Sequence, residues 1–174
     1  MALLAAAFAN DGVVMKPYMV ERVVTPNGIT LEQHRSEKWF EATTAARASL
    51  IHGFMEEVVQ EGTGTAAALR GVRVAGKTGT AENYVKINGK RMQLTDHSIF
   101  VAFAPAEDPK IAIAVFVENG YYGARVAAPI ASLMIEKYLK GEVYRCALET
   151  RMLETSLEHE YAKPYSGQPF TINR

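Results

Sequence analysis

The sequence contains the stretch Val72-Arg73-Val74-Ala75-Gly76-Lys77-Thr78-Gly79-Thr80-Ala81-Glu82, and the rest of the chain can be arranged around it. Its first half favours an extended backbone, and its second half carries Lys-Thr-Gly-Thr. Such a strand offers a fixed cation, hydroxyls that can bind a carboxylate, and a glycine that lets a substrate lie against the backbone. These are groups that an acyl-transfer site uses, so the stretch predicts a strand at the centre of such a site.

The same residues also match the phosphate-loop pattern G-x-x-x-x-G-K-[ST], from Gly71 to Thr78. A phosphate loop needs flexible residues inside it and a helix directly after the lysine, so that backbone N–H groups converge on phosphate. Here the inner residues favour a strand, and the segment after Thr78 has no helix-starting pattern. Nucleotide binding is therefore the weaker interpretation of this stretch.

Composition restricts the class of protein. The chain has 174 residues and 48% hydrophobic content, which predicts one folded domain with a core. Its 19 basic and 19 acidic residues cancel, so electrostatics give no case for a nucleic-acid partner. The single cysteine and the scattered histidines form no metal-ligand pattern, and we expect no metal and no cofactor. The apolar start, residues 1–9, is too short for a membrane-spanning helix and lacks the features of a signal peptide.

We expect an α+β fold in which helices pack on an antiparallel sheet. Three strands connected in sequence order predict that sheet: residues 72–82, 98–103 and 110–117. Asn88-Gly89 predicts a type I′ hairpin that stands out from the sheet over residues 84–94. The turn at residues 25–28 predicts a second, peripheral hairpin.

Apolar spacing predicts the helices. One is expected at residues 1–10, and another from a cap at Thr43 or Thr44 to Gly62. A third is expected at about residues 125–140, packed on the sheet, and a short one in the charged segment after it, with residues 161–174 irregular. The residues assigned to the core of the second helix are Ile51, Phe54, Met55, Val58 and Val59, and those assigned to one face of the third are Ile130, Leu133, Met134 and Tyr138.

Four segments in order carry a family resemblance: residues 61–67 (Glu-Gly-Thr-Gly-Thr-Ala-Ala), 77–82, 97–105 and 127–131 (Ala-Ala-Pro-Ile-Ala). Together they resemble the transpeptidase domain of penicillin-binding proteins, most closely the class B, elongation-type members. The resemblance implies that residues 1–140 are the C-terminal portion of such a domain and residues 141–174 a C-terminal tail. It also implies a serine acyltransferase that attacks the D-alanyl-D-alanine end of a peptidoglycan stem peptide, and a target of β-lactams.

The family uses three motifs, Ser-x-x-Lys with the nucleophile, Ser-x-Asn and Lys-Thr-Gly. This sequence contains the third, and none of its six serines begins either of the other two. Both of those motifs lie upstream in the family, so Met1 is expected to be an internal methionine of a longer parent. The resemblance therefore implies that this chain is inactive alone.

The resemblance also assigns roles to the residues of the third motif. Lys77 would supply positive charge that helps bind the terminal carboxylate of the substrate and move a proton. The hydroxyls of Thr78 and Thr80 would bind that carboxylate, and the backbone N–H of Thr80 would form half of an oxyanion hole. Gly79 would let the substrate approach. Alternation along a strand, however, places Thr78 and Thr80 on one face and Lys77 with Gly79 on the other.

The expected partners are the stem peptide and, in the intact domain, β-lactams. The resemblance implies a parent anchored in the inner membrane, with its domain in the periplasm, that serves the cell-wall elongation machinery. Because the family sheet has two further strands from upstream sequence, we expect an uncovered edge and face here, and self-association of the chain. A non-catalytic module that binds peptides or other proteins is the alternative function.

Overall fold

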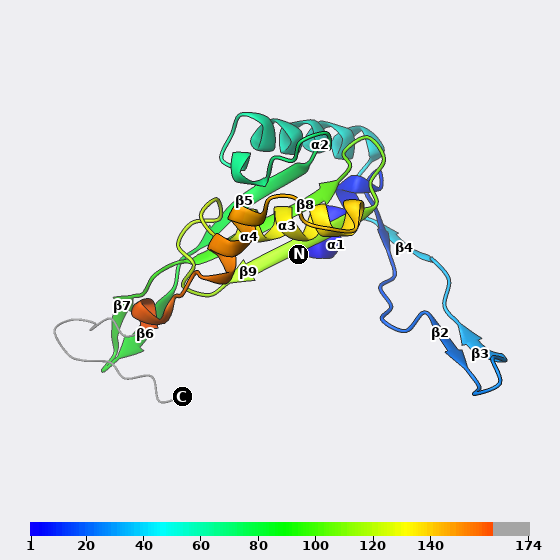
Figure 1. Ribbon diagram of the computed structural model, residues 1–174, viewed down its shortest axis with the longest axis horizontal. Helices are drawn as coiled ribbons and strands as arrows, with labels where there is room; N and C mark the ends of the chain where they lie inside the picture. The colour runs from blue at the N-terminus through cyan, green and yellow to red at the C-terminus, as the bar shows by residue number, and fades with distance from the viewer. Residues whose placement is uncertain (162–174) are drawn as a thin grey trace.

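A three-stranded antiparallel sheet forms the centre of the computed structural model, which describes residues 1–161. Its strands lie in the order β5 (Ala75–Ala81), β8 (His97–Ala104) and β9 (Ile111–Val117). The sequence prediction of these strands is confirmed, although β5 begins later than residue 72. The expected α+β class is confirmed as well, with helices on both faces of this sheet (Figure 1).

Each face of the sheet has its own core. On one face, Phe100 and Ala102 pack with residues of α3 (Ala127–Lys140). On the other face, Ala75 and Phe103 pack near α1 (Ala2–Ala9). The helix α2 (Ala45–Gln60) lies against β5 and contributes to both cores, with Val59 in the first and Met55 in the second. The sheet therefore separates two apolar layers, and α2 connects them.

The second helix begins at the predicted cap, but fewer of its side chains are buried than predicted. Thr44 accepts a hydrogen bond from the backbone N–H of Arg47, at 3.4 Å. Met55 and Val59 are buried, but Phe54 is 54% exposed, so its assignment to the core is wrong. The reason is that the neighbouring face of α2 borders an open trough beside the sheet.

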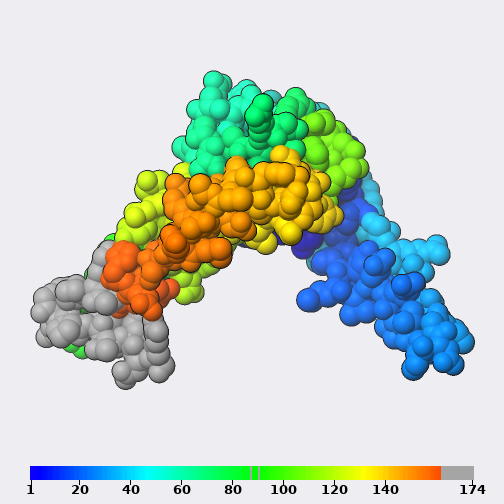
Figure 2. All heavy atoms as spheres, viewed as in Figure 1, coloured from blue at the N-terminus to red at the C-terminus, as the bar shows by residue number. Residues whose placement is uncertain are grey.

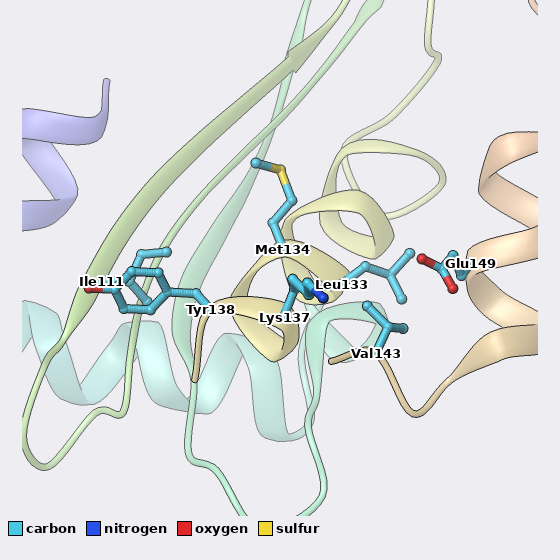
Figure 3. Close-up of a pocket in the computed structure, with 7 residues that line it drawn as sticks. All are labelled: Ile111, Leu133, Met134, Lys137, Tyr138, Val143 and Glu149. Carbon is cyan, nitrogen blue, oxygen red and sulfur yellow. The ribbon is translucent and has the colours of Figure 1, made fainter. Parts of the chain in front are cut away.

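The prediction of which residues of the third helix pack on the sheet is also partly wrong. Helix α3 does pack on the sheet, but it does so through small residues and Ile135, while Met134 is 53% and Tyr138 62% exposed. Alanines allow the helix axis to approach the strands closely, which turns the larger side chains outward. Figure 3 shows both side chains extending from α3, with Tyr138 beside Ile111, around a pocket of about 700 Å³. Gly141 ends the helix in the left-handed conformation, as expected.

Three two-stranded ribbons extend from this body. The β6 (Tyr84–Ile87) and β7 (Lys90–Gln93) hairpin has φ of 51° at Asn88 and 77° at Gly89, which confirms the predicted type I′ turn. The predicted peripheral hairpin is β2 (Arg22–Val24) with β3 (Thr30–Gln33), and all its strand residues are exposed. This hairpin projects from one end of the molecule (Figures 1 and 2), and β6–β7 lies at the opposite end (Figure 1). The pairing of β1 (Val13–Met15) with β4 (Lys38–Glu41) was not predicted.

The segment after α3 is attached by an ion pair to a buried carboxylate. Glu136 is 3% exposed, and its carboxylate lies 3.0 Å from Nε of Arg145. Arg145 also donates a hydrogen bond to the carbonyl of Ala68, beside the short 3₁₀ turn η1 (Thr65–Ala67).

Two helices follow, α4 (Cys146–Leu153) and α5 (Glu158–Tyr161). The irregular conformation expected for residues 161–174 lies outside the described residues, apart from Tyr161, which is helical. None of the helices within residues 1–161 has the length and apolar character that crossing a bilayer requires.

Replacing Phe100 should test the core between β8 and α3. Phe100 is fully buried, so Phe100→Ala removes apolar contacts and leaves a cavity, and the free energy of unfolding should fall by about 3–5 kcal/mol. Phe40→Ala is the matched control, because Phe40 is 46% exposed on β4, and it should change stability by less than about 1 kcal/mol. Urea denaturation followed by circular dichroism measures both. Equal losses in the two variants would contradict the assignment of this core.

Candidate functional site

The Lys-Thr-Gly-Thr residues lie in the second half of β5. Cross-strand pairing places Lys77 opposite Val101 and Thr78 opposite Phe100. Phe100 belongs to the core under α3, and Val101 borders the trough on the other face. The alternation predicted from the sequence is therefore present, with the threonines on the α3 side and Lys77 with Gly79 on the trough side. A ligand that contacts side chains of both faces therefore has to bind at the edge of the strand, where both faces can be reached.

Hydrogen bonds hold two of the site side chains at this strand. Nζ of Lys77 donates to the carbonyl of Thr78 at 2.9 Å, which turns the ammonium group back along the backbone. The hydroxyls of Thr78 and Thr63 are 2.7 Å apart, and Thr63 lies in the turn after α2. Lys77 and Thr80 are exposed, and Thr78 is partly buried. The ammonium group of Lys77 therefore lies against the backbone of the residue that carries the hydroxyl, and Lys77 remains accessible to an anionic ligand.

The outer edge of β5 has no strand partner among the described residues, because β8 pairs on its other side. Backbone N–H and C=O groups at such an edge can pair with an added extended peptide. The substrate approach that we expected from the sequence therefore has a suitable edge.

An apolar trough of about 400 Å³ adjoins this edge. Its floor includes Gly79 and Val101, and its walls are α1 and α2, with Phe54 as one of the exposed wall residues. Lys77 and Thr78 line the same trough. The trough places the cation next to an apolar surface, where its charge is less screened than in bulk water.

Two supporting residues were not recognised from the sequence as part of the site. The buried hydroxyl of Ser98 donates to the carbonyl of Tyr122 and accepts from the N–H of Ala127, each at 3.1 Å. Ser98 lies opposite Thr80, so this pair of bonds holds residues 122–127 against the sheet beside the site. Gly123 makes this approach possible, since a Cβ there would lie 2.3 Å from the carbonyl oxygen of Ile99. No sequence motif marked these contacts, because they join segments that are far apart along the chain.

The phosphate-loop interpretation of Gly71 to Thr78 is wrong. Strand β5 continues through Lys77 and Thr78 to Ala81, so no helix opens after the lysine. The backbone N–H groups of an extended strand point alternately to opposite sides and cannot converge on one phosphate. Within residues 1–161 there is also no group of three His, Cys, Asp or Glu side chains placed to hold a metal ion.

Comparison with protein families gives one match that covers most of the chain. The model described as the penicillin binding protein transpeptidase domain matches residues 1–136. Among curated proteins, the peptidoglycan D,D-transpeptidase PbpA of Mycolicibacterium smegmatis is 36% identical over 147 residues, which are 80% of this chain and 28% of the relative. Stage V sporulation protein D of Bacillus subtilis is 35% identical over 130 residues, 72% of this chain and 20% of the relative.

Solved structures of transpeptidase domains are similar to this chain as well. The D,D-transpeptidase domain of a peptidoglycan glycosyltransferase from Eggerthella lenta has a TM-score of 0.67 and 38% identity, covering 80% of this chain and 31% of that one. The penicillin G acyl-enzyme complex of penicillin-binding protein A from M. tuberculosis has a TM-score of 0.67 and 34% identity, covering 79% and 31%. The chain thus spans less than a third of the length of these relatives.

Two glycine-to-alanine substitutions should have opposite effects on stability. Gly123→Ala forces a Cβ against the backbone of Ile99 and Gly79, and we expect the free energy of unfolding to fall by about 1–3 kcal/mol. Gly53→Ala in α2 meets nothing within 4 Å and should raise it by up to about 1 kcal/mol through helix propensity. Thermal denaturation of both variants measures this difference. A Gly123→Ala protein as stable as the parent would show that the loop does not depend on this contact.

Proposed function

Because the chain belongs to the penicillin-binding protein transpeptidase family, we propose that the outer edge of β5 binds the D-alanyl-D-alanine terminus of a peptidoglycan stem peptide. The observation that carries the proposal is the position of the Lys77 ammonium at the Thr78 carbonyl, on an edge of β5 that has no strand partner within residues 1–161. A terminal carboxylate needs a cation and hydrogen-bond donors, and an extended peptide needs a strand edge. This edge offers both.

Each residue of the motif has a role in this proposal. The hydroxyls of Thr78 and Thr80 bind the terminal carboxylate, and Gly79 leaves space for the peptide backbone. Lys77 adds charge and assists proton movement once its ammonium turns from the Thr78 carbonyl toward the substrate. The Thr80 N–H donates to the carbonyl oxygen that becomes negative when a serine attacks, as D-alanine leaves and an acyl-enzyme forms.

The attacking serine is not among the six serines of this chain, since none belongs to a Ser-x-x-Lys or Ser-x-Asn motif. We propose that the chain is inactive alone and that residues 1–140 complete a transpeptidase domain whose nucleophile comes from further sequence. The apolar trough supports this proposal, because it ends at Lys77 and Thr78 and its walls carry exposed apolar side chains. The parent would be membrane-anchored, with this domain outside the cytoplasm, and would act in cell-wall elongation.

A peptide-binding module without catalysis is the second candidate function. It is favoured by the same observation, because the carboxylate-binding groups are present while the serine motifs are not. The two candidates differ in whether a covalent intermediate forms when the missing sequence is supplied.

Incubation with a fluorescent penicillin should leave no covalent label on the 174-residue chain. The reason is chemical, because acylation needs an activated serine, and none of the serines has a lysine three residues on. Mass spectrometry of the denatured protein measures the adduct, and a related transpeptidase with its Ser-x-x-Lys motif is the positive control. A penicilloyl adduct on this chain would overturn the proposed inactivity.

A peptide ending in D-alanyl-D-alanine should bind the chain and shift the amide signals of β5 in NMR spectra. Lys77→Met should weaken binding by about tenfold or more, because a charge-assisted hydrogen bond to the carboxylate is lost. Lys86→Met, which removes an exposed lysine of the β6–β7 hairpin, is the control and should bind normally. Equal affinity for the C-terminally amidated peptide would exclude carboxylate recognition at this edge.

A further inference from the structure

The turn Gly62-Thr63-Gly64 lies between the end of α2 and η1, beside the strand that carries Lys-Thr-Gly-Thr. It belongs to one of the four segments that resemble the family, and its sequence alone assigns it no role. In the structure the hydroxyl of Thr63 lies 2.7 Å from the hydroxyl of Thr78. The turn therefore contacts the strand at a side chain that the proposed function assigns to carboxylate binding.

Close packing on α2 fixes the backbone on both sides of Thr63. A Cβ at Gly62 would lie 2.9 Å from Cα of Val58, and a Cβ at Gly64 would lie 3.0 Å from the carbonyl oxygen of Val58. The chain can come this close only with glycine at both positions. The backbone N–H of Gly64 also donates to that carbonyl at 2.8 Å. The side chain of Thr63 is therefore presented to the strand by a turn that is bound to the end of α2.

Two cations at and after the end of α3 hold the segment that follows this turn. Arg145 donates to the carbonyl of Ala68 at 3.4 Å, and Nζ of Lys140 donates to the carbonyl of Arg70 at 3.2 Å. The turn and the segment after it are thus anchored at both ends. The position of Thr63 is consequently set before any ligand binds, which lowers the entropy cost of binding.

We propose that Thr63 is a positioning residue for carboxylate recognition, whose hydroxyl donates to the Thr78 hydroxyl and directs the Thr78 proton toward the terminal carboxylate of the peptide. This inference rests on the proposed function of β5. A threonine hydroxyl has one proton and two lone pairs, and an ionised carboxylate can only accept. When Thr78 gives its proton to the ligand, the hydrogen bond between the two threonines has to use the proton of Thr63.

This order of donors also strengthens the bond to the ligand. A hydroxyl that accepts a hydrogen bond becomes a better donor, because a chain of such bonds polarises each of its members. The bond from Thr63 also restricts rotation of the Thr78 side chain, so less freedom is lost when the carboxylate binds. Thr63 therefore acts through Thr78, without touching the peptide itself.

NMR titration of the full chain with a peptide ending in D-alanyl-D-alanine tests this role. Thr63→Val keeps the shape of the side chain but removes its hydroxyl, and should raise the Kd about fivefold. Thr63→Ser retains the donor and should change the Kd by less than about twofold. Thr65→Val is the matched control and should bind normally, because Thr65 is an exposed threonine of the same segment, at the start of η1. All three variants should melt within about 2 °C of the parent, since these are surface substitutions.

A double variant separates positioning from direct contact. Thr78→Val removes the hydroxyl that Thr63 directs, so adding Thr63→Val to it should weaken binding no further. A further loss in the double variant would show that Thr63 contacts the peptide and would overturn the positioning role. Parent-like binding by Thr63→Val, in a chain that prefers the peptide carboxylate to its C-terminal amide, would overturn this inference alone. A parent chain that binds both peptides equally would overturn the proposed function and this inference with it.

Discussion

The backbone pairing of β8 with strands on both of its sides is the constraint on which the rest of the structure depends. Among the described strands of the central sheet β8 alone has two strand neighbours, and six of its residues, Ser98 and Phe100 to Ala104, are buried. Phe100 and Phe103 alternate between the two faces and anchor a different core on each. Since β8 fixes the register of β5, it also fixes where Lys77 and Thr78 lie relative to both cores. The position of the site is therefore a consequence of packing around one strand.

Local signals predicted most elements and their limits. The Thr44 cap, the Asn88-Gly89 turn and the Gly141 stop each act within a few residues of the backbone, so their effect can be recognised in sequence. The buried faces of α2 and α3 were harder to predict, because periodicity identifies an apolar stripe but not how closely a helix approaches the sheet. In α3 the contact is made by small residues, and the larger Met134 and Tyr138 remain outside. The pairing of β1 with β4 depends on contacts between segments separated by more than twenty residues, which no local pattern encodes.

The candidate site also has one part that the sequence predicted and one part that it did not. Its chemical groups were recognisable because Lys77, Thr78, Gly79 and Thr80 are consecutive and belong to a motif. Their support was not recognisable, because it comes from three separate places: the hydroxyl of Thr63, the hydroxyl of Ser98 and the missing side chain of Gly123. A hydroxyl that holds a loop is chemically ordinary, and its importance follows only from what the fold brings beside it.

The two free edges of the sheet present the same backbone requirement with opposite side-chain chemistry. Unpaired N–H and C=O groups favour an added strand at either edge, so the side chains decide which strand is accepted. Along β5 the cation and hydroxyls favour a short peptide that ends in a carboxylate. Along β9 all seven strand residues are apolar, so this strand offers no cation or hydroxyl to such a peptide. The side chains of β5, and not its free backbone groups alone, are therefore what makes that edge suitable for an anionic peptide.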